Sequence, residues 1–455
     1  MSDSVQKYSA SRMGSAPIGP LLLSCSVPMM ISMLVQALYN IVDSIFVSRV
    51  NEAALSAVSL AFPIQNLMIA FAVGTAVGVN AYLSRCLGEG NRAEASRAAM
   101  NGLFLAFCGG IAFLVFGILG ARAFIASQTT DAQIMQYGAD YLSICTLWCM
   151  GLFLQCMLEK LLVATGRSAF AMASQLIGAL VNIALDLLFV AKFGMGVYGA
   201  AWATVIALAL SWLCSIWYIR RYAPELEFPL LPHRFDGKTL RKMIQIGLPL
   251  GMNTALYSTG HLILQILFNL QGSTFVAGCS VAGKVASFAN LAIASLSSTM
   301  TVFSGQNLGA GNYRRLCRGA WLVPLCAGTI TLSAGILVTI FCNPLLSLFT
   351  QDVTVLAVAV RYIHIVLPFT WMYAIMNVIM CFANGIGEIK YPTIVNLFIL
   401  WGVRIPVAYL LSRLGYGGYA MASVPLSFLA GMILMLFYFR TKRWAKLCAL
   451  AKNEP

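Results

Sequence analysis

Two acidic residues lie well inside long apolar stretches of the chain, Asp43 and Asp186. A charge in the hydrocarbon of a membrane costs about 2.5–3.5 kcal/mol on insertion scales, so a carboxylate kept there is expected to serve a function. Asn182 precedes Asp186 by four residues, which places both on one helix face, and Thr204 lies in the next apolar stretch. These four side chains could together bind Na⁺ or a proton. Structural hydrogen bonding between helices, or pairing with a buried base, is the alternative role.

Three further residues of the first apolar stretch could support that site. Gln36 and Tyr39 precede Asp43 and could line a substrate cavity beside it, although plain helix packing would explain them equally. Pro28 has no backbone N–H to donate and is predicted to kink its helix. The kink could be a hinge that follows the state of Asp43, or a fixed bend.

Two basic residues also fall inside apolar stretches, Lys284 and Arg404. They could set the charge selectivity of a central cavity, and Lys284 is a candidate for lining the substrate site. Alternatively, they extend toward the membrane surface or pair with a backbone carbonyl. Glu159, beside Lys160 and near Arg167, is predicted to form a local ion pair.

The composition indicates which elements must position these residues. Of 455 residues, 60% are hydrophobic and 10% are charged, whereas an ordinary soluble domain carries about 25% charged residues. Much of the apolar surface must therefore face lipid, which excludes a disordered chain and a collagen. A membrane-spanning helix needs about 20 mostly apolar residues. About 12 such stretches occur, near 18–47, 54–83, 97–121, 135–164, 170–191, 197–219, 241–270, 275–303, 318–342, 356–384, 392–412 and 418–439.

The basic residues predict the orientation of these helices. Lys and Arg prefer cytoplasmic loops, and most of the 29 here fall at the two termini and in every second loop. The remaining loops hold only Arg49, Arg122, Lys192, Arg361 and Arg413. Both termini are therefore expected to be cytoplasmic. The net charge of +14 is interpreted as this orientation signal, which also suits anionic lipid headgroups, and a nucleic-acid partner is not expected. The 13 cysteines are scattered among apolar runs and predict no metal cluster.

The second half of the chain resembles the first half in a single register, without gaps. Matching residues include Pro28 with Pro249, Asp131 with Asp352, Gly166 with Gly387, and Gly194 with Gly415. Each copy holds six predicted helices, an even number, so both copies enter the membrane from the same side as parallel repeats. The expected organisation is a cytoplasmic segment 1–17, an N-lobe 18–219, a cytoplasmic linker 220–240, a C-lobe 241–440 and a cytoplasmic tail 441–455.

The two copies differ at the acidic positions. The residues equivalent to Asp43 and Asp186 in the second copy are Leu264 and Val407, and Val403 replaces Asn182. The acids are thus confined to the first copy. We interpret this difference as an ion site that is present in the N-lobe alone.

Three stretches resemble signatures of the multidrug and toxic compound extrusion (MATE) transporters. Residues 39–47 read YNIVDSIFV and resemble the family's first helix, and residues 306–312 read QNLGAGN and resemble its loop between helices 8 and 9. Residues 164–167, ATGR, resemble the end of its helix 4. The resemblance extends from about residue 18 to 440 and includes the helix count, the repeat and the linker.

The resemblance implies an all-α integral membrane protein whose two six-helix lobes form a V. It implies a transporter rather than an enzyme, one that exports organic, often cationic, drugs and toxic compounds in exchange for H⁺ or Na⁺. One branch of the family carries its ion site on residues matching Asp43, Asn182, Asp186 and Thr204. Another branch uses carboxylates of helices 7 and 10, which have none in their interiors here. The protein is expected to act as a monomer in a bacterial-type inner membrane, with no cofactor besides the coupling ion, and to contribute to antibiotic resistance.

Three alternatives remain open on the sequence. A lipid-linked saccharide flippase of the same superfamily would need cationic residues in a central cavity, where only Lys284 and Arg404 could serve. A major-facilitator transporter would carry a different motif in the loop after helix 2. An intramembrane enzyme would need a catalytic group near a membrane face. The choice between H⁺ and Na⁺ and the native substrate also remain open.

Overall fold

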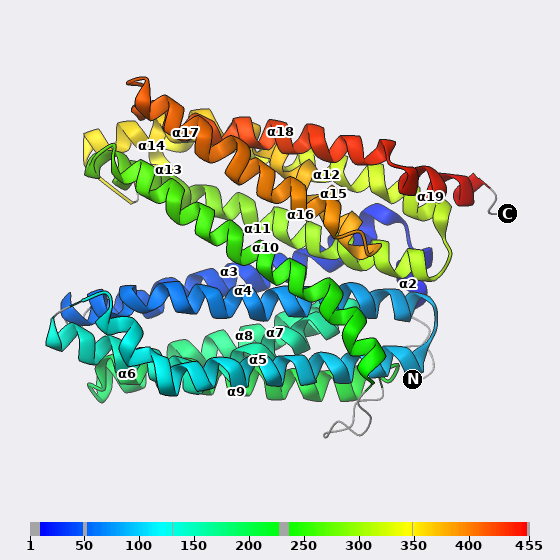
Figure 1. Cartoon of the computed structure of the whole chain (residues 1–455), viewed down its shortest axis with the longest axis horizontal. Helices are drawn as coiled ribbons and strands as arrows, with labels where there is room; N and C mark the ends of the chain where they lie inside the picture. The colour runs from blue at the N-terminus through cyan, green and yellow to red at the C-terminus, as the bar shows by residue number, and fades with distance from the viewer. Residues whose placement is uncertain (1–9, 49–51, 130, 227–235, 348, 453–455) are drawn as a thin grey trace. The chain divides into compact units, whose positions relative to one another are not determined.

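The computed structural model describes residues 10–48, 52–129, 131–226, 236–347 and 349–452. Within its helices the side chains of residues 10–12, 37–48, 52–59, 62–63, 132–134, 191, 196–197 and 200–201 are not described. Over the described ranges the elements are all helical and no strand occurs, which confirms the all-α fold class (Figure 1). The side chains of Tyr39 and Asp43 lie outside the described residues.

Each of the predicted membrane-spanning stretches falls on one helix or on two or three consecutive helical segments. Ten described helices are long and apolar enough to cross a membrane. An eleventh span results when Met135–Leu147 and Cys149–Ala164, bent by 44°, are taken together. Helix α10 (Gly237–Asn269) covers the stretch predicted at 241–270, and its 33 residues are long enough to span, but it is less apolar than the others.

Two compact units make up the described chain, residues 10 and 27–254 forming the first and residues 11–26 and 255–452 the second. In the first unit α4, α5 and α7 pack against one another and α8 lies along α9 (Figure 1). Its elements are α3 (Ile18–Ser48), α4 (Glu52–Gly88), α5 (Arg92–Ala126), α6 (Ala132–Leu147), α7 (Cys149–Ala164), α8 (Ser168–Asp186), the π-helical η1 (Leu187–Lys192) and α9 (Gly196–Tyr222).

In the second unit α11 packs against α12, α14 and α15, and α15 packs against α18. Its elements are α2 (Ala10–Ser15), α11 (Ser273–Gly309), α12 (Tyr313–Ile340), α13 (Cys342–Ser347), α14 (Val353–Val366), η2 (Leu367–Phe369), α15 (Thr370–Gly385), α16 (Lys390–Leu397), the π-helical η3 (Phe398–Arg404), α17 (Ile405–Arg413), η4 (Gly417–Ala422), α18 (Ser423–Phe437), η5 (Tyr438–Arg440) and α19 (Lys442–Lys452).

Two helices belong partly to each unit. Helix α3 begins in the second unit and continues in the first from Val27, whereas α10 begins in the first unit and continues in the second from Ala255. Pro28 and Pro249 lie inside these helices, close to the points where each helix passes from one compact unit to the other. The predicted lobes, 18–219 and 241–440, assign each helix whole to one lobe and so differ from the compact units at residues 18–26 and 241–254.

The backbone of the turns repeats between the two units. A positive φ favours glycine, which has no side chain to clash, and every positive φ in the described chain belongs to a glycine. Three pairs of these glycines follow the register that matches Pro28 with Pro249, and the φ angles within each pair are similar. They are Gly90 and Gly311 (70° and 74°), Gly166 and Gly387 (both 79°), and Gly194 and Gly415 (66° and 81°). The turns therefore support an internal duplication.

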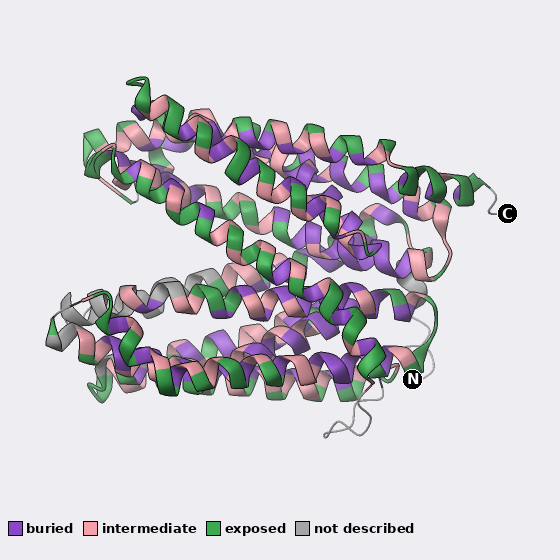
Figure 2. Ribbon diagram, in the orientation of Figure 1, coloured by how far each residue is buried: buried purple, intermediate pink, exposed green. Residues whose placement is uncertain are grey.

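Large apolar side chains remain on the outside of the helices. Leu119 is 78% exposed, Leu270 73% and Ile340 69%, and Figure 2 shows exposed positions recurring along the outer faces of the helices in each unit. Apolar surface of this extent marks contact with another apolar phase, which for spanning helices is lipid. The chain is a multi-pass membrane protein.

Candidate functional site

Three of the four predicted ion-coupling residues lie on two packed helices of the first unit, α8 and α9. Asn182 and Asp186 of α8 are 2% and 0% exposed. The Asn182 amide nitrogen Nδ2 donates a hydrogen bond of 3.5 Å to Thr204 Oγ1 of α9. Asn182 Oδ1 has no hydrogen-bond partner among the described residues. The fourth residue, Asp43, lies in α3, where its side chain is outside the described residues.

The sequence of α8 explains how these side chains are held. Gly178 lies one turn before Asn182, and a Cβ there would meet Ser211 Cβ at 3.0 Å and the Ala207 carbonyl oxygen at 3.2 Å. The glycine thus permits α8 and α9 to approach closely. Asp186 is the last residue of α8 before the π-helical η1. Such π-helical turns are rare and occur frequently at functional sites.

A small polar cavity adjoins Asn182 and Thr204. Its volume is about 50 Å³, which can hold water or a small cation but is below the roughly 300–1,000 Å³ of drug-binding pockets. Gln36, a predicted cavity residue, is among those that line it. The polar lining residues are neutral amides and hydroxyls, namely Ser32, Gln36, Gln155, Gln175, Asn182, Thr204 and Ser211.

A chain of polar contacts leads from this cavity to an ion pair. Ser32 of α3 donates to Gln175 Oε1, and Gln175 Nε2 donates to Glu159 of α7. Lys160 Nζ lies 2.9 Å from Glu159 Oε1, which confirms the predicted local pair. Arg167, also considered there, instead pairs with Glu225, three residues beyond the end of α9.

Gln155 is a polar residue that the sequence interpretation missed. It lines the cavity, is only 5% exposed, and neither its amide nitrogen nor its amide oxygen has a hydrogen-bond partner among the described residues. A usable signal was its position four residues before Glu159, on the same face of α7.

The other predicted candidates are placed separately from this group. Lys284 of α11 belongs to the second unit and is exposed, and its ammonium lies 5.8 Å from the centroid of the Phe349 ring. Its role in a substrate cavity stays a prediction, as does the role of Pro28 as a hinge. No group of three or more His, Cys, Asp or Glu side chains in the described ranges could hold a metal ion.

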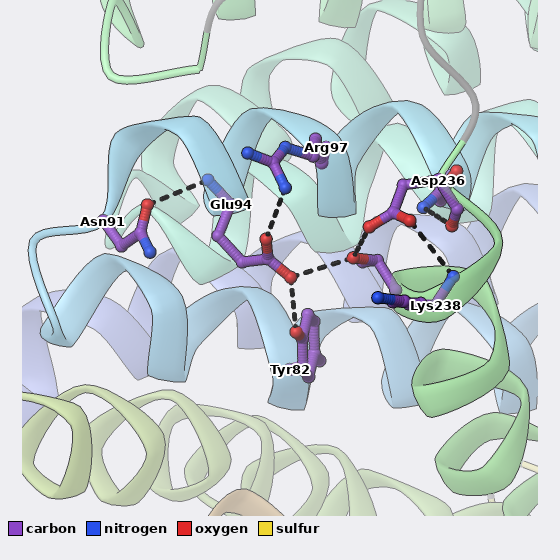
Figure 3. Close-up of polar contacts among 8 residues, drawn as sticks. Tyr82, Asn91, Glu94, Arg97, Asp236 and Lys238 are labelled. Atoms are coloured by element: carbon purple, nitrogen blue, oxygen red, sulfur yellow. Dashed lines mark hydrogen bonds and ion pairs between the residues drawn. The ribbon is translucent and has the colours of Figure 1, made fainter.

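A second polar group fastens the start of α10 to α4 and α5 (Figure 3). Glu94 of α5 accepts a hydrogen bond of 2.7 Å from the Tyr82 hydroxyl of α4 and pairs with Arg97 at 3.3 Å. The Thr239 hydroxyl of α10 lies 2.8 Å from Glu94 Oε1 and 2.6 Å from Asp236 Oδ2. This cluster therefore positions the helix that continues into the second unit.

In the second unit, an equivalent residue of opposite charge holds the segment that leads into α3. In the register of the duplication, Arg315 lies at the position equivalent to Glu94. Its guanidinium donates to the backbone oxygens of Met13 (3.2 Å) and Ala16, just before α3. In each unit, a residue in the first turn of the third helix of the repeat therefore holds the start of a helix that continues into the other unit.

Comparison with known proteins relates this architecture to a family. The model of the MatE family matches twice, at residues 28–188 and 249–410, and the two matches begin at the equivalent residues Pro28 and Pro249. A probable multidrug resistance protein of Bacillus subtilis, YoeA, is 27% identical over 91% of this chain and 92% of its own. An FAD transporter of Shewanella oneidensis is 26% identical over 87% of this chain and 88% of its own.

The fold is also that of a solved transporter. A structure described as the outward-facing conformation of a multidrug resistance MATE family transporter superposes with a TM-score of 0.89 at 21% identity. The superposition covers 97% of this chain and 98% of the other. Since the family model covers most of the chain in two matches, the chain belongs to the MatE family of membrane transporters and is not an enzyme.

Proposed function

We propose that the protein is an antiporter that exports organic cations in exchange for H⁺ or Na⁺. The observation that carries the proposal is the Asp186 carboxylate, fully buried one turn beyond the Asn182–Thr204 pair. The second repeat has valine at the positions equivalent to Asn182 and Asp186, so this polar group belongs to one lobe only. Asp43 is proposed as the second carboxylate of the site.

The coupling ion is proposed to bind between α8 and α9. A Na⁺ ion would be held by Asp186, Asn182 Oδ1 and Thr204 Oγ1, all oxygen ligands of the kind that hard cations prefer. A proton would bind a carboxylate directly. In either case the bound cation neutralises a charge that is costly to bury, which changes the relative stability of the outward- and inward-open states.

Export follows when drug and ion favour opposite states. The bound ion would favour release of drug outside, and drug binding would favour the reverse change. One charge that crosses a potential of 100 mV supplies about 2.3 kcal/mol, or roughly 50-fold in concentration at about 1.4 kcal/mol per tenfold. The 50 Å³ cavity fits the ion, so a drug must bind when the lobe has opened further.

A lipid-linked saccharide flippase is less favoured as the function. The curated relatives above are named for drug resistance and for FAD transport, and neither name describes a saccharide flippase. Because relatives are named for different substrates, the test below uses one defined organic cation. We further propose that the protein acts as a monomer in the inner membrane of a bacterial cell.

The proposal is tested with ethidium uptake into everted membrane vesicles that contain the protein. A pH gradient, acidic inside, and a Na⁺ gradient, high inside, are imposed separately. We expect one of the two to drive uptake above that of vesicles without the protein. Uptake under neither gradient would contradict cation-coupled export and would return weight to the flippase.

A further inference from the structure

The second unit contains a much larger cavity than the first. Its volume is about 390 Å³, within the range of small-molecule sites. Helices α10, α11, α14, α15 and α18 and the π-helical η3 supply its walls, all with residues of the second unit. The site proposed above for the coupling ion uses none of these residues.

A buried positive charge lines this cavity. Arg404 is 3% exposed. Its Nε donates to Ser427 Oγ at 2.9 Å, and its Nη1 lies 3.4 Å from the Tyr257 hydroxyl oxygen, a long hydrogen bond. Its Nη2, which carries two further N–H donors, has no acceptor among the described residues. The guanidinium is therefore only partly satisfied by the protein.

No acidic side chain neutralises this charge within the described ranges. The ion pairs found there join other residues, and none includes Arg404. A buried charge without a counter-charge is unfavourable. An anion that enters the cavity would supply the missing charge and an acceptor for Nη2, and a strong acceptor could also replace the long bond to Tyr257.

The fold holds the guanidinium firmly at this place. Arg404 ends the π-helical η3, and its guanidinium carbon lies 5.3 Å from the centroid of the Phe428 ring. The neighbouring Ser427 is fixed in turn, because its hydroxyl donates to the Val424 carbonyl at 2.6 Å. Because α18 holds one side of the guanidinium, the N–H donors on its other side stay in a fixed planar arrangement that can bind a ligand.

The remaining walls suit an aromatic ligand with an anionic group. Tyr257, His261, Tyr362 and Tyr373 line the cavity together with Phe428, and aromatic rings bind flat ligands by stacking. Tyr373 also offers a donor, because its hydroxyl oxygen accepts a hydrogen bond of 3.1 Å from Asn377 and its own proton remains to be donated.

We propose that Arg404 anchors a binding site for an aromatic anion, with a carboxylate or phosphate on the guanidinium and the ring among the tyrosines. The residue equivalent to Arg404 in the first repeat is Ile183, so the two units differ in the charge they bury. The first unit carries a buried aspartate and suits a cation, whereas the second suits an anion. The anionic group comes either from a soluble organic anion or from a lipid headgroup.

The site is tested by binding of 1-naphthyl phosphate to the full-length protein in phosphatidylcholine nanodiscs, measured by titration calorimetry without any ion gradient. We expect the native protein to bind it and Arg404→Met to bind about tenfold more weakly or worse, the equivalent of about 1.4 kcal/mol. The cation (1-naphthyl)methylammonium has the same ring, and its affinity should not be lowered by Arg404→Met. Arg413→Met is the matched control, since Arg413 is exposed at the end of α17 and contacts Tyr409.

A second variant and a second lipid complete the test. Tyr373→Phe keeps the ring and loses the hydroxyl donor, so it should weaken naphthyl phosphate about fivefold, even if Arg404→Met fails to fold in a thermal unfolding assay. In nanodiscs containing phosphatidylglycerol, displacement of naphthyl phosphate from the native protein identifies a headgroup as the ligand. Undiminished binding there identifies a soluble anion.

Equal binding by the native protein, Arg404→Met and Tyr373→Phe would overturn the proposal. A second pair of results would also overturn it. In that case the native protein does not bind naphthyl phosphate, and phosphatidylglycerol shifts the unfolding midpoint of the native protein no more than that of Arg404→Met. Because no transport is measured, these results are independent of the ethidium experiment.

Discussion

At the scale of single residues, the polar side chains that line the cavity of the first unit are neutral. Asn182 meets Thr204, and Ser32, Gln175 and Glu159 form a connected chain. Neutral amides can rearrange around a cation without the cost of separating ion pairs. This favours a site that binds and releases its ion in each cycle.

Gln155 should show a conflict between stability and transport. Its amide is buried and has no partner among the described residues, and such a group costs about 1–3 kcal/mol. We expect Gln155→Met, of similar length, to raise the thermal unfolding midpoint in detergent and to lower ethidium transport.

The matched variant for this comparison is Gln175→Met. Gln175 is bonded on both sides, to Ser32 and Glu159, so its loss leaves the partly buried Glu159 carboxylate with one donor fewer. Its unfolding midpoint should fall. A fall of the same size for Gln155→Met would show that Gln155 is satisfied in the folded protein.

Sequence reasoning reached some of these residues and not others, for a physical reason. An aspartate inside an apolar stretch is conspicuous because burying its charge is costly, and its four-residue spacing from Asn182 placed both on one face. Gln155 carries no charge, so its burial leaves little trace in the pattern. The partners of Arg404 depend on how η3 packs against α18, which no local spacing specifies.

At the scale of helices, close packing depends on residues without side chains. Gly385 of α15 faces α11, and a Cβ there would lie 2.4 Å from the Thr301 carbonyl oxygen and 2.0 Å from Ser304 Oγ. Small residues that let helix backbones approach are typical of membrane interfaces. The packing of α11 on α15 therefore requires glycine at this position.

Gly385→Ala should separate α11 from α15 and destabilise the protein by about 1–3 kcal/mol, measured as a lower unfolding midpoint. Gly283, on α11 itself, is the control, because a Cβ there meets nothing within 4 Å. Gly283→Ala should leave the midpoint unchanged or raise it, since alanine favours a helix. Equal losses for the two variants would contradict this account of the packing.

The spans themselves were predictable, because hydropathy over about 20 residues is a strong signal. The division of α3 and α10 between the units was not, since it arises from contacts such as those of Arg315 with Met13 and of Thr239 with Glu94. These contacts join segments far apart in the sequence.

At the scale of the whole molecule, a duplicated chain has acquired different interiors in its two units. The turn glycines repeat, and so do the contacts by which Glu94 and Arg315 hold the start of a helix, so the two units share one backbone plan. The buried charges do not repeat, with Asp186 in one unit and Arg404 in the other. The family model matched both copies in the same register.

The orientation in the membrane is predicted to place both termini in the cytoplasm. Alkaline phosphatase, which is active only outside the cytoplasm, should be inactive when fused to the C-terminus and active when fused after Phe193, between η1 and α9. A green fluorescent protein fusion should give the opposite pattern. Reversed activities would contradict the topology inferred from the basic residues.

The central claim is that Asp186 couples transport to the cation gradient, and Asp186→Asn tests it most directly. The control is Asp352→Asn, because Asp352 caps α14 through Thr354 N at 2.8 Å and asparagine caps equally well. The hydrogen bond from the Thr354 side chain also lowers the pKa of Asp352, so both variants replace an ionised or ionisable aspartate by its amide.

In everted vesicles, ethidium uptake driven by the effective gradient should fall about tenfold or more in Asp186→Asn, because the amide can neither take up a proton nor balance the charge of Na⁺. Uptake by Asp352→Asn should match the native protein, with equal amounts of both variants in the membrane. Native uptake by Asp186→Asn would contradict the account.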